Sequence, residues 1–143
     1  MTLASRITRL PLPLDPARGQ VALETTGIAE PLVGDLLRGA AGSSPYLAGL
    51  IAREADWLAE TLSHPEAALI GPDLVAAETA GFETLSPDAL GPALRRAKRR
   101  VALWTALADL GGIWRLEEVT GALTRLADRA VDLALRAHLG AEQ

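Results

Sequence analysis

The chain has 143 residues, of which 49% are hydrophobic and only 3% aromatic, so we expect a single domain whose core is built from Leu, Ala, Val and Ile. The net charge of −4 disfavours general affinity for nucleic acid or anionic lipid, and the absence of cysteine excludes disulfides and thiolate chemistry. No stretch approaches the roughly 20 apolar residues that a membrane span needs, and no unbroken apolar region typical of a secretory signal opens the sequence. We therefore predict a cytoplasmic protein without a membrane anchor.

The first part of the chain has weak periodicity. Residues 1–26 contain three prolines and a glycine, which predicts an irregular N-terminal arm. A helical domain is expected over residues 27–143. It begins with a short helix over residues 28–37, and the glycines and serines of residues 39–44 predict a loop after it.

The next segment reads SSPYLAGLIAREADWLAETL and favours one helix. Ser44 is a suitable N-cap and Pro45 suits the first helical position. Apolar residues then recur at helical spacing, namely Leu47, Leu50, Ile51, Trp57, Leu58 and Leu62. A further helix over residues 66–80 is expected to be interrupted at Gly71 and Pro72.

Two longer helices are predicted in the C-terminal half, over residues 88–111 and 115–139. Apolar residues step by three and four through both ranges, and Gly111 and Gly112 separate them. A short connection of this kind favours an antiparallel helix pair. Because no segment shows the alternation of a strand, the sequence predicts an all-α helical bundle of four to six helices.

A basic cluster opens the first of these helices and is the candidate interaction surface. Its members interrupt an apolar stripe that continues through Leu94, Ala97 and Val101, so they cover the outward faces of an amphipathic helix. They could be a solvated face that pairs with acids of neighbouring helices, a docking site for an acidic surface, or a nucleic-acid site. The last is least favoured, because interleaved aromatic residues and a basic overall charge are missing. The cluster consists of Arg95, Arg96, Lys98, Arg99 and Arg100.

The residues themselves favour no active site. With no cysteine and only His64 and His138 as histidines, no metal site of the Cys/His kind is expected. Asp128 and Asp132 lie four positions apart beside several arginines, which favours surface ion pairing. No phosphate-binding loop is present. We predict no catalytic, metal-binding or cofactor-binding residue in this chain.

Two segments resemble the bifunctional glutamine synthetase adenylyltransferase/adenylyl-removing enzymes. The longer one reads LRRAKRRVALWTALADLGGIWRLEEVTGALTRLADRAVDLALR and follows the family's order: a basic helix start, an apolar Ala-Leu-Ala-Asp-Leu helix, a turn with Trp, and Leu-Glu-x-Val-Thr-x-Ala-Leu. The shorter one is the segment that starts at Ser43, which resembles the family's Ser-Pro-aromatic-Leu segment. Together they cover about half of the chain.

The resemblance implies a function for full-length members of this family. They transfer AMP from ATP to a tyrosine of glutamine synthetase and remove it by phosphorolysis in a second domain, and glutamine and the PII signalling protein set the balance in nitrogen regulation. ATP and Mg²⁺ are the cofactors expected for the full-length family. Neither the Gly-Ser-x-Asp nor the Asp-x-Asp motif of its nucleotidyltransferase domains occurs in this sequence, so we transfer no catalytic residue and predict that this chain alone is inactive.

The resemblance covers only the helical segment that precedes the N-terminal nucleotidyltransferase domain. The first hypothesis is therefore a scaffold fragment of the enzyme, with glutamine synthetase, PII and the catalytic domain in cis as partners. Such a fragment is expected to self-associate through apolar surface that the next domain would cover. Charge reversal at Arg95 and Arg99 in a full-length enzyme should impair removal of AMP. The second hypothesis is a free-standing, non-catalytic helical interaction module.

Overall fold

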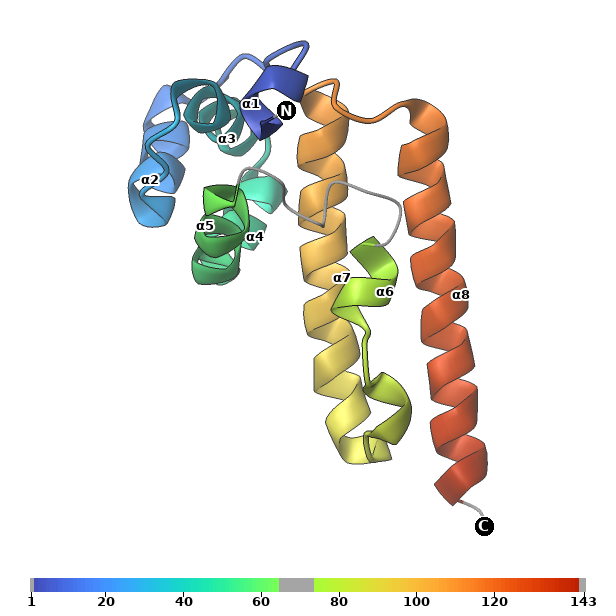
Figure 1. Ribbon diagram of the computed structural model, residues 1–143. Coiled ribbons are helices and arrows are strands. Elements are labelled where there is room, and N and C mark those ends of the chain that lie inside the picture. Colours follow the sequence, from blue (N-terminus) through green and yellow to red (C-terminus); the bar gives the residue numbers. More distant parts are fainter. Residues whose placement is uncertain (1, 65–73, 142–143) are drawn as a thin grey trace.

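The computed structural model describes residues 2–64 and 74–141 and is all-α (Figure 1). The predicted fold class is confirmed, but these residues form eight α-helices and one 3-10 helix rather than four to six helices, and they form no strand. The predicted interruption at Gly71 and Pro72 lies outside the described residues. The helices are α1 (Leu3–Arg6), α2 (Pro16–Thr26), α3 (Pro31–Ser43), α4 (Pro45–Arg53), α5 (Ala55–Ser63), α6 (Leu74–Glu78), η2 (Phe82–Thr84), α7 (Pro87–Leu110) and α8 (Leu116–Ala141).

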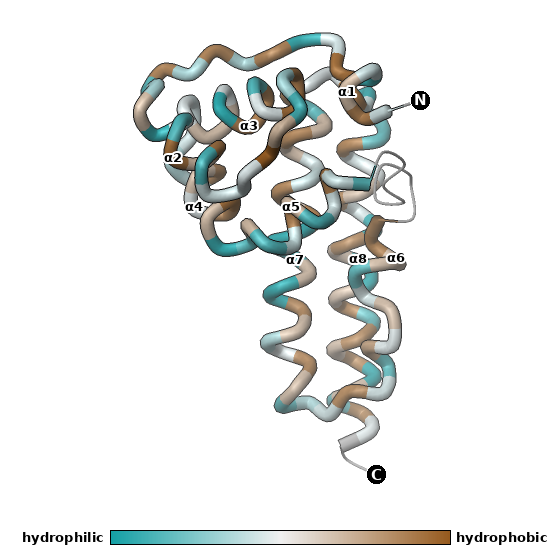
Figure 2. The backbone as a smooth tube through the Cα atoms, turned by 60° about the vertical axis from the view of Figure 1, so that its left-hand side comes forward, coloured by the Kyte–Doolittle hydropathy of each residue, from teal (hydrophilic) through white to brown (hydrophobic). Residues whose placement is uncertain are grey.

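The helices are arranged as a head and a stalk. The head comprises α1 to α5 and gathers around one end of α7, whereas the stalk comprises α6, η2, α7 and α8 (Figures 1 and 2). α7 and α8 run in opposite directions and pack against each other, and the C-terminal end of α8 lies at the far end of the stalk (Figure 1). None of the helices that the structure describes is long and apolar enough to cross a membrane.

Helix α7 contributes to both parts of the core, which explains the apolar run after the basic cluster. Leu103 and Leu107 pack into a cluster with residues of α2 to α5, among them Leu37 and Ile51. Trp104 and its neighbours on a second face pack instead with residues of α1, α3, α6 and α8; the main members are Leu3, Val33, Leu74, Val101, Trp104, Ala108 and Leu126. The head and the stalk therefore share one central helix.

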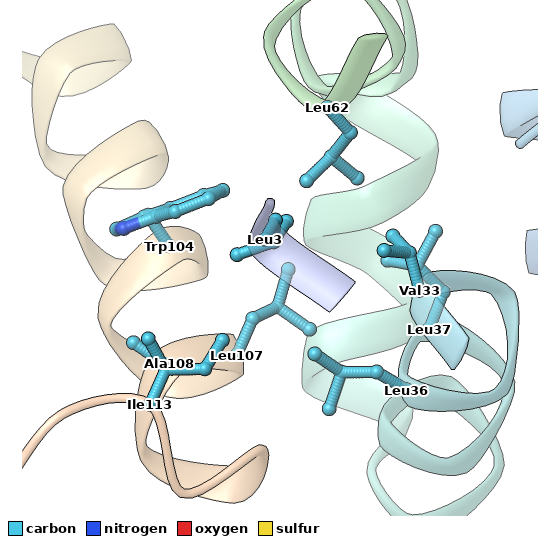
Figure 3. A pocket seen from close by; sticks show the side chains of 9 residues that line it. All are labelled: Leu3, Val33, Leu36, Leu37, Leu62, Trp104, Leu107, Ala108 and Ile113. Carbon is cyan, nitrogen blue, oxygen red and sulfur yellow. The ribbon is translucent and has the colours of Figure 1, made fainter. Parts of the chain in front are cut away.

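A small apolar pocket lies where the head meets this second face. Its volume is about 10 Å³, and its lining is entirely apolar (Figure 3). Leu3 of α1 and Leu62 of α5 point into it from one side and Trp104 of α7 from the other (Figure 3). The junction is thus closely packed, as protein interiors are.

The N-terminal segment is not the irregular arm that the sequence predicts. It contains α1 and α2, and the side chain of Asp15 accepts a hydrogen bond from the Arg18 amide at the start of α2. Pro16 occupies the first turn of α2, where proline is favoured because its missing N–H needs no partner there. The prediction failed because it took this proline as a helix breaker.

Between α1 and α2, residues 7–14 form an extended strap across the head. The Thr8 amide donates to the Gly111 carbonyl (2.8 Å), and the Thr8 hydroxyl donates to the Gly112 carbonyl (2.9 Å). The Ser43 hydroxyl donates to the carbonyl of Leu12. The strap thereby ties the turn between α7 and α8 to the C-terminal end of α3.

The strap also explains why α3 continues through the predicted loop at residues 39–44. A Cβ atom on Gly39 would lie 2.1 Å from the Pro11 carbonyl oxygen, and one on Gly42 would lie 2.5 Å from the Pro13 Cβ. These glycines are helical residues whose lack of a side chain lets the strap approach the helix. Local glycine content was therefore a misleading signal for a loop.

The single helix predicted after Ser44 is divided at Glu54. This residue has φ −112° and ψ 24°, and it separates α4 from α5 although no glycine or proline lies there. The Glu54 amide still donates to the Leu50 carbonyl, and the Leu58 amide donates to the Glu54 carbonyl. The chain thus bends at Glu54 while its backbone hydrogen bonds are kept.

Candidate interaction surface on helix α7

The structure divides the predicted basic cluster into two groups. Arg95, Arg96 and Lys98 are exposed, whereas Arg99 and Arg100 are only partly exposed. All five lie on α7, which Ser86 caps by accepting a hydrogen bond from the Ala89 amide. The two groups differ because α4 and α6 pack against one side of α7 and Trp57 of α5 lies against Arg100.

Arg99 and Arg100 are held by the buried carboxylate of Glu54. Arg99 Nε lies 3.2 Å from Glu54 Oε1, and Arg100 Nε lies 3.0 Å from Glu54 Oε2. The Glu54 side chain is only 5% exposed, so both of its oxygens are removed from bulk water. A buried carboxylate needs such partners, since an unpaired charge in the interior is costly.

Arg100 also contacts two further helices. Its Nη1 lies 3.6 Å from Glu78 Oε2 at the end of α6, and its guanidinium lies over the ring of Trp57 in α5, 5.3 Å from the centroid. A guanidinium at this position gains a cation–π interaction in addition to its ion pairs. Arg100 therefore joins α5, α6 and α7 at the boundary between head and stalk.

The remaining basic residues are available to a partner. Within residues 2–64 and 74–141, no ion pair involves Arg95, Arg96 or Lys98. We call these three residues the basic patch. Arg99 and Arg100 thus pair with acidic residues of neighbouring helices, which is one of the interpretations that the sequence allowed. Of the predicted interaction surface, only the basic patch has no such ion pair.

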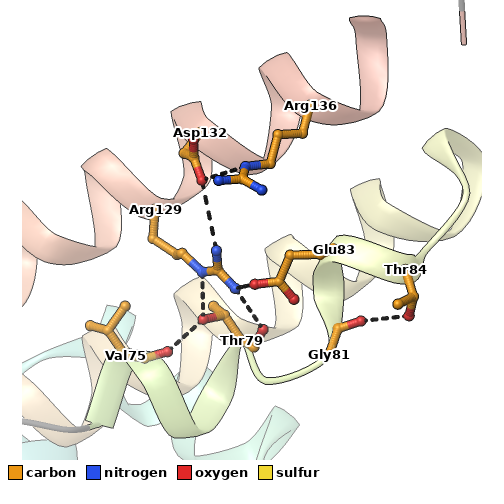
Figure 4. A network of polar contacts seen from close by, with 8 residues as sticks. All are labelled: Val75, Thr79, Gly81, Glu83, Thr84, Arg129, Asp132 and Arg136. Carbon is orange, nitrogen blue, oxygen red and sulfur yellow. Dashed lines mark hydrogen bonds and ion pairs between the residues drawn. The ribbon is translucent and has the colours of Figure 1, made fainter. Parts of the chain in front are cut away.

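A second network joins Thr79, which follows α6, and Glu83 of η2 to α8 (Figure 4), and only its pairs with Asp132 were expected from the sequence. Arg129 Nε lies 3.2 Å from the Thr79 hydroxyl, and Arg129 Nη2 donates to the Thr79 carbonyl and to the Glu83 carboxylate. This hydrogen bond from Arg129 is the main cause that lowers the pKa of Glu83 below its ordinary value. Asp132 pairs with Arg129 and, at 3.0 Å, with Arg136, which is the surface pairing expected of Asp132.

Both networks contain a residue that the sequence could have revealed. Glu54 follows Leu50 by four positions and precedes Leu58 by four, so it occupies a core position of the apolar face. Arg129 occupies the equivalent place between Leu126 and Leu133 in α8. A charged residue at a core position signals a buried partner elsewhere, but the pattern does not identify that partner.

The described side chains form no cluster of three or more acidic, histidine or cysteine residues that could hold a metal ion. His64 ends α5 and His138 lies in the last turns of α8, so the structure does not bring the two histidines together. The ion pairs found at Glu54 and Arg129 join helices to one another.

Comparison with known proteins gives a consistent picture. The sequence model of the family described as glutamate-ammonia ligase adenylyltransferase matches residues 34–142. A bifunctional glutamine synthetase adenylyltransferase/adenylyl-removing enzyme from Caulobacter vibrioides is 42% identical over 95 residues, which are 65% of this chain and 9% of that protein. No solved structure matches the chain.

Two further relatives carry the same name. The protein from Rhodopseudomonas palustris strain TIE-1 is 39% identical over 115 residues, which are 80% of this chain and 12% of the relative. The protein from Xanthobacter autotrophicus is 36% identical over 130 residues, which are 89% of this chain and 13% of the relative. The chain spans about a tenth of the length of these relatives. Because the family match covers most of the described helices, the chain belongs to the glutamate-ammonia ligase adenylyltransferase family.

Proposed function

We propose that this chain is a helical scaffold segment of a glutamine synthetase adenylyltransferase/adenylyl-removing enzyme and has no catalytic activity alone. The observation that carries the proposal is the family match over residues 34–142, combined with coverage of only 9–13% of the relatives. For the whole protein we propose transfer of AMP to glutamine synthetase and its removal, as the names of the relatives state. Glutamine synthetase and the PII protein are its proposed partners, ATP and Mg²⁺ its proposed cofactors, and the cytoplasm its proposed location.

The head and stalk support this role because ion pairs join their helices. Glu54 binds two arginines of α7, and Arg129 binds Thr79 and Glu83, so the stalk is cross-linked at two levels. A segment of this kind can hold a catalytic domain in a fixed orientation. The basic patch, which these networks leave unpaired, is then the surface proposed to contact an acidic face of the rest of the enzyme.

A chimera tests the proposal. The segment of the Caulobacter vibrioides enzyme that corresponds to residues 34–142 is replaced by these residues, and both AMP transfer to glutamine synthetase and AMP removal are assayed. We expect both rates to stay within about tenfold of the parent, which is a barrier change of roughly 1.4 kcal/mol. This chain by itself should show neither reaction.

Charge reversal in the chimera then tests the basic patch. Changing Arg95, Arg96 and Lys98 to Glu should lower the rate of AMP removal more than tenfold, whereas a matched triple reversal elsewhere should not. The matched variant changes three other exposed arginines, Arg53, Arg115 and Arg125, to Glu. Arg99 is left out because its contact with Glu54 is structural. An inactive chimera, despite a helical and soluble chain, would favour the free-standing interaction module instead.

A further inference from the structure

The strap is held to the molecule without a buried side chain. It runs along the edge of the head between α1 and α2 (Figure 2). The nearest buried residues along the chain are Leu3 in α1 and Gly19 in α2, so the strap is anchored on both sides. Ile7 packs partly against both core clusters, but Leu12 and Leu14 are 80% and 84% exposed. The strap therefore gains little free energy from the burial of apolar surface.

At its first end the strap supplies donors to the last carbonyls of α7 and the turn after it. The Thr8 amide donates to the Gly111 carbonyl, and the Thr8 hydroxyl donates to the Gly112 carbonyl. The Arg9 guanidinium donates to the Asp109 carbonyl (2.7 Å) and places a positive charge where the helix dipole is negative. Both side-chain hydrogen bonds are exposed. Water can therefore replace the strap as the donor when the strap leaves.

At its other end the strap is bound to the last residues of α3. The Ser43 hydroxyl donates to the Leu12 carbonyl (2.5 Å) in an exposed hydrogen bond, and the Asp15 amide donates to the Gly42 carbonyl (2.8 Å). The two prolines between these ends have fixed φ angles. They stiffen the segment, so release at one end should weaken the contacts at the other.

We infer that the strap is a latch, which opens and closes as one unit while both core clusters stay folded. Segments held mainly by exposed hydrogen bonds open at a lower free energy than the core. The anchors at Leu3 and Gly19 keep the open strap near its site, so the loop that must close again is short. Closed, the latch ties the turn between α7 and α8 to α3. Open, it leaves this turn to its own hydrogen bonds, such as that from the Ile113 amide to the Ala108 carbonyl (2.8 Å). The inference does not depend on the proposed function.

Native-state hydrogen exchange of the whole chain, followed by NMR, tests the latch. The amides of Thr8, Arg9 and Asp15 report on the two ends of the strap, and their opening constants should agree within about threefold. These constants should exceed those of the Val101 and Trp104 amides by on the order of a hundredfold or more, because both of these residues lie in the core. Equal constants in the strap and in α7 would mean that the strap opens only when the whole protein unfolds, and the inference would then be wrong.

One variant at each end tests whether the two ends open together. Ser43→Ala removes the donor to the Leu12 carbonyl. It should raise the opening constant of the Thr8 amide, at the far end, by about threefold to tenfold, the usual effect of one hydrogen bond. Thr8→Val removes the donor to the Gly112 carbonyl and should raise the opening constant of the Asp15 amide by a similar factor.

The matched controls remove an exposed hydroxyl hydrogen bond that lies within one helix. Ser63→Ala loses the bond to the Glu60 carbonyl in α5, and Thr25→Val loses the bond to the Val21 carbonyl in α2. Both should leave the opening constants of the strap unchanged, and circular dichroism verifies that all four variants remain helical. An effect confined to the amides beside each substitution would show a strap that frays from its ends, which would overturn the latch.

Discussion

At the scale of single residues, Glu83 gives the stability of the stalk a dependence on pH. Its pKa is lowered chiefly by the hydrogen bond from Arg129, so the folded state favours the charged carboxylate more than the unfolded state does. The stabilisation is therefore present above the ordinary glutamate pKa of about 4.3 and is lost as the pH falls through the lower folded value. Glu83→Gln should lower Tm at pH 7 and reduce the fall of Tm between about pH 5 and 3.

The measurement is Tm against pH for the parent and for Glu83→Gln, followed by circular dichroism. Glu60→Gln is the control, since Glu60 is exposed on α5 and has no ion pair among the residues that the structure describes. The control should reproduce the parent curve. If Glu83→Gln also retains the full acid dependence, the Glu83–Arg129 pair is not its source.

Residue identity predicted the basic cluster but not its division. Arg99 differs from Arg95 only because Glu54 lies beside it, and Glu54 is 45 positions earlier in the chain. The period of one helix cannot identify a partner on another. The helical pattern therefore located a polar face on α7. Which arginines on this face form ion pairs within the fold, and which stay exposed, depends on how Glu54 packs against it.

At the scale of elements, the contact between the strap and α3 can be tested with two glycines. Gly39→Ala should destabilise the protein by about 1–3 kcal/mol, because the added methyl would overlap the Pro11 carbonyl and displace the strap. Gly49→Ala is the matched control on α4, where nothing lies within 4 Å of the added atom. It should be neutral or stabilising by up to about 1 kcal/mol, since alanine favours helix. Urea denaturation measures both; equal effects would show that the strap does not press on Gly39.

The long helices were easier to predict than the short ones, for a physical reason. The ranges 88–111 and 115–139 lie close to the bounds of α7 and α8, where four or more turns of apolar periodicity outweigh local exceptions such as Pro92. In α2 and α3 the local signals are prolines and glycines. A proline or glycine breaks a helix in one setting and starts it, or lets another segment approach it, in a different one. The sequence alone does not show which segment will pack against it.

At the scale of the whole molecule, Glu54 links the head to the stalk. Glu54→Gln should destabilise the fold by about 1–3 kcal/mol, the usual cost of losing hydrogen bonds to a charged group. Because α7 belongs to both core clusters, the loss of these hydrogen bonds should lower the unfolding midpoint of the whole protein, not that of the head or the stalk alone.

Denaturation followed by tryptophan fluorescence and by circular dichroism should therefore give one shared midpoint, lower than that of the parent. Trp104 reports on the cluster shared with α8, and Trp57 on the contact with Arg100. Two separate midpoints in Glu54→Gln would mean that head and stalk unfold independently. Arg95→Lys, which alters an exposed side chain of the basic patch, should leave the midpoint in place.

The strap has a consequence for the order in which the chain can fold. The Thr8 hydroxyl bonds a carbonyl 104 positions later, at Gly112. During synthesis, Thr8 and Arg9 cannot make these contacts until α7 and the turn after it have left the ribosome. Closing so long a loop costs entropy that only the finished head can offset. Thr8 is thus made long before the carbonyl group that its hydroxyl contacts in the native state.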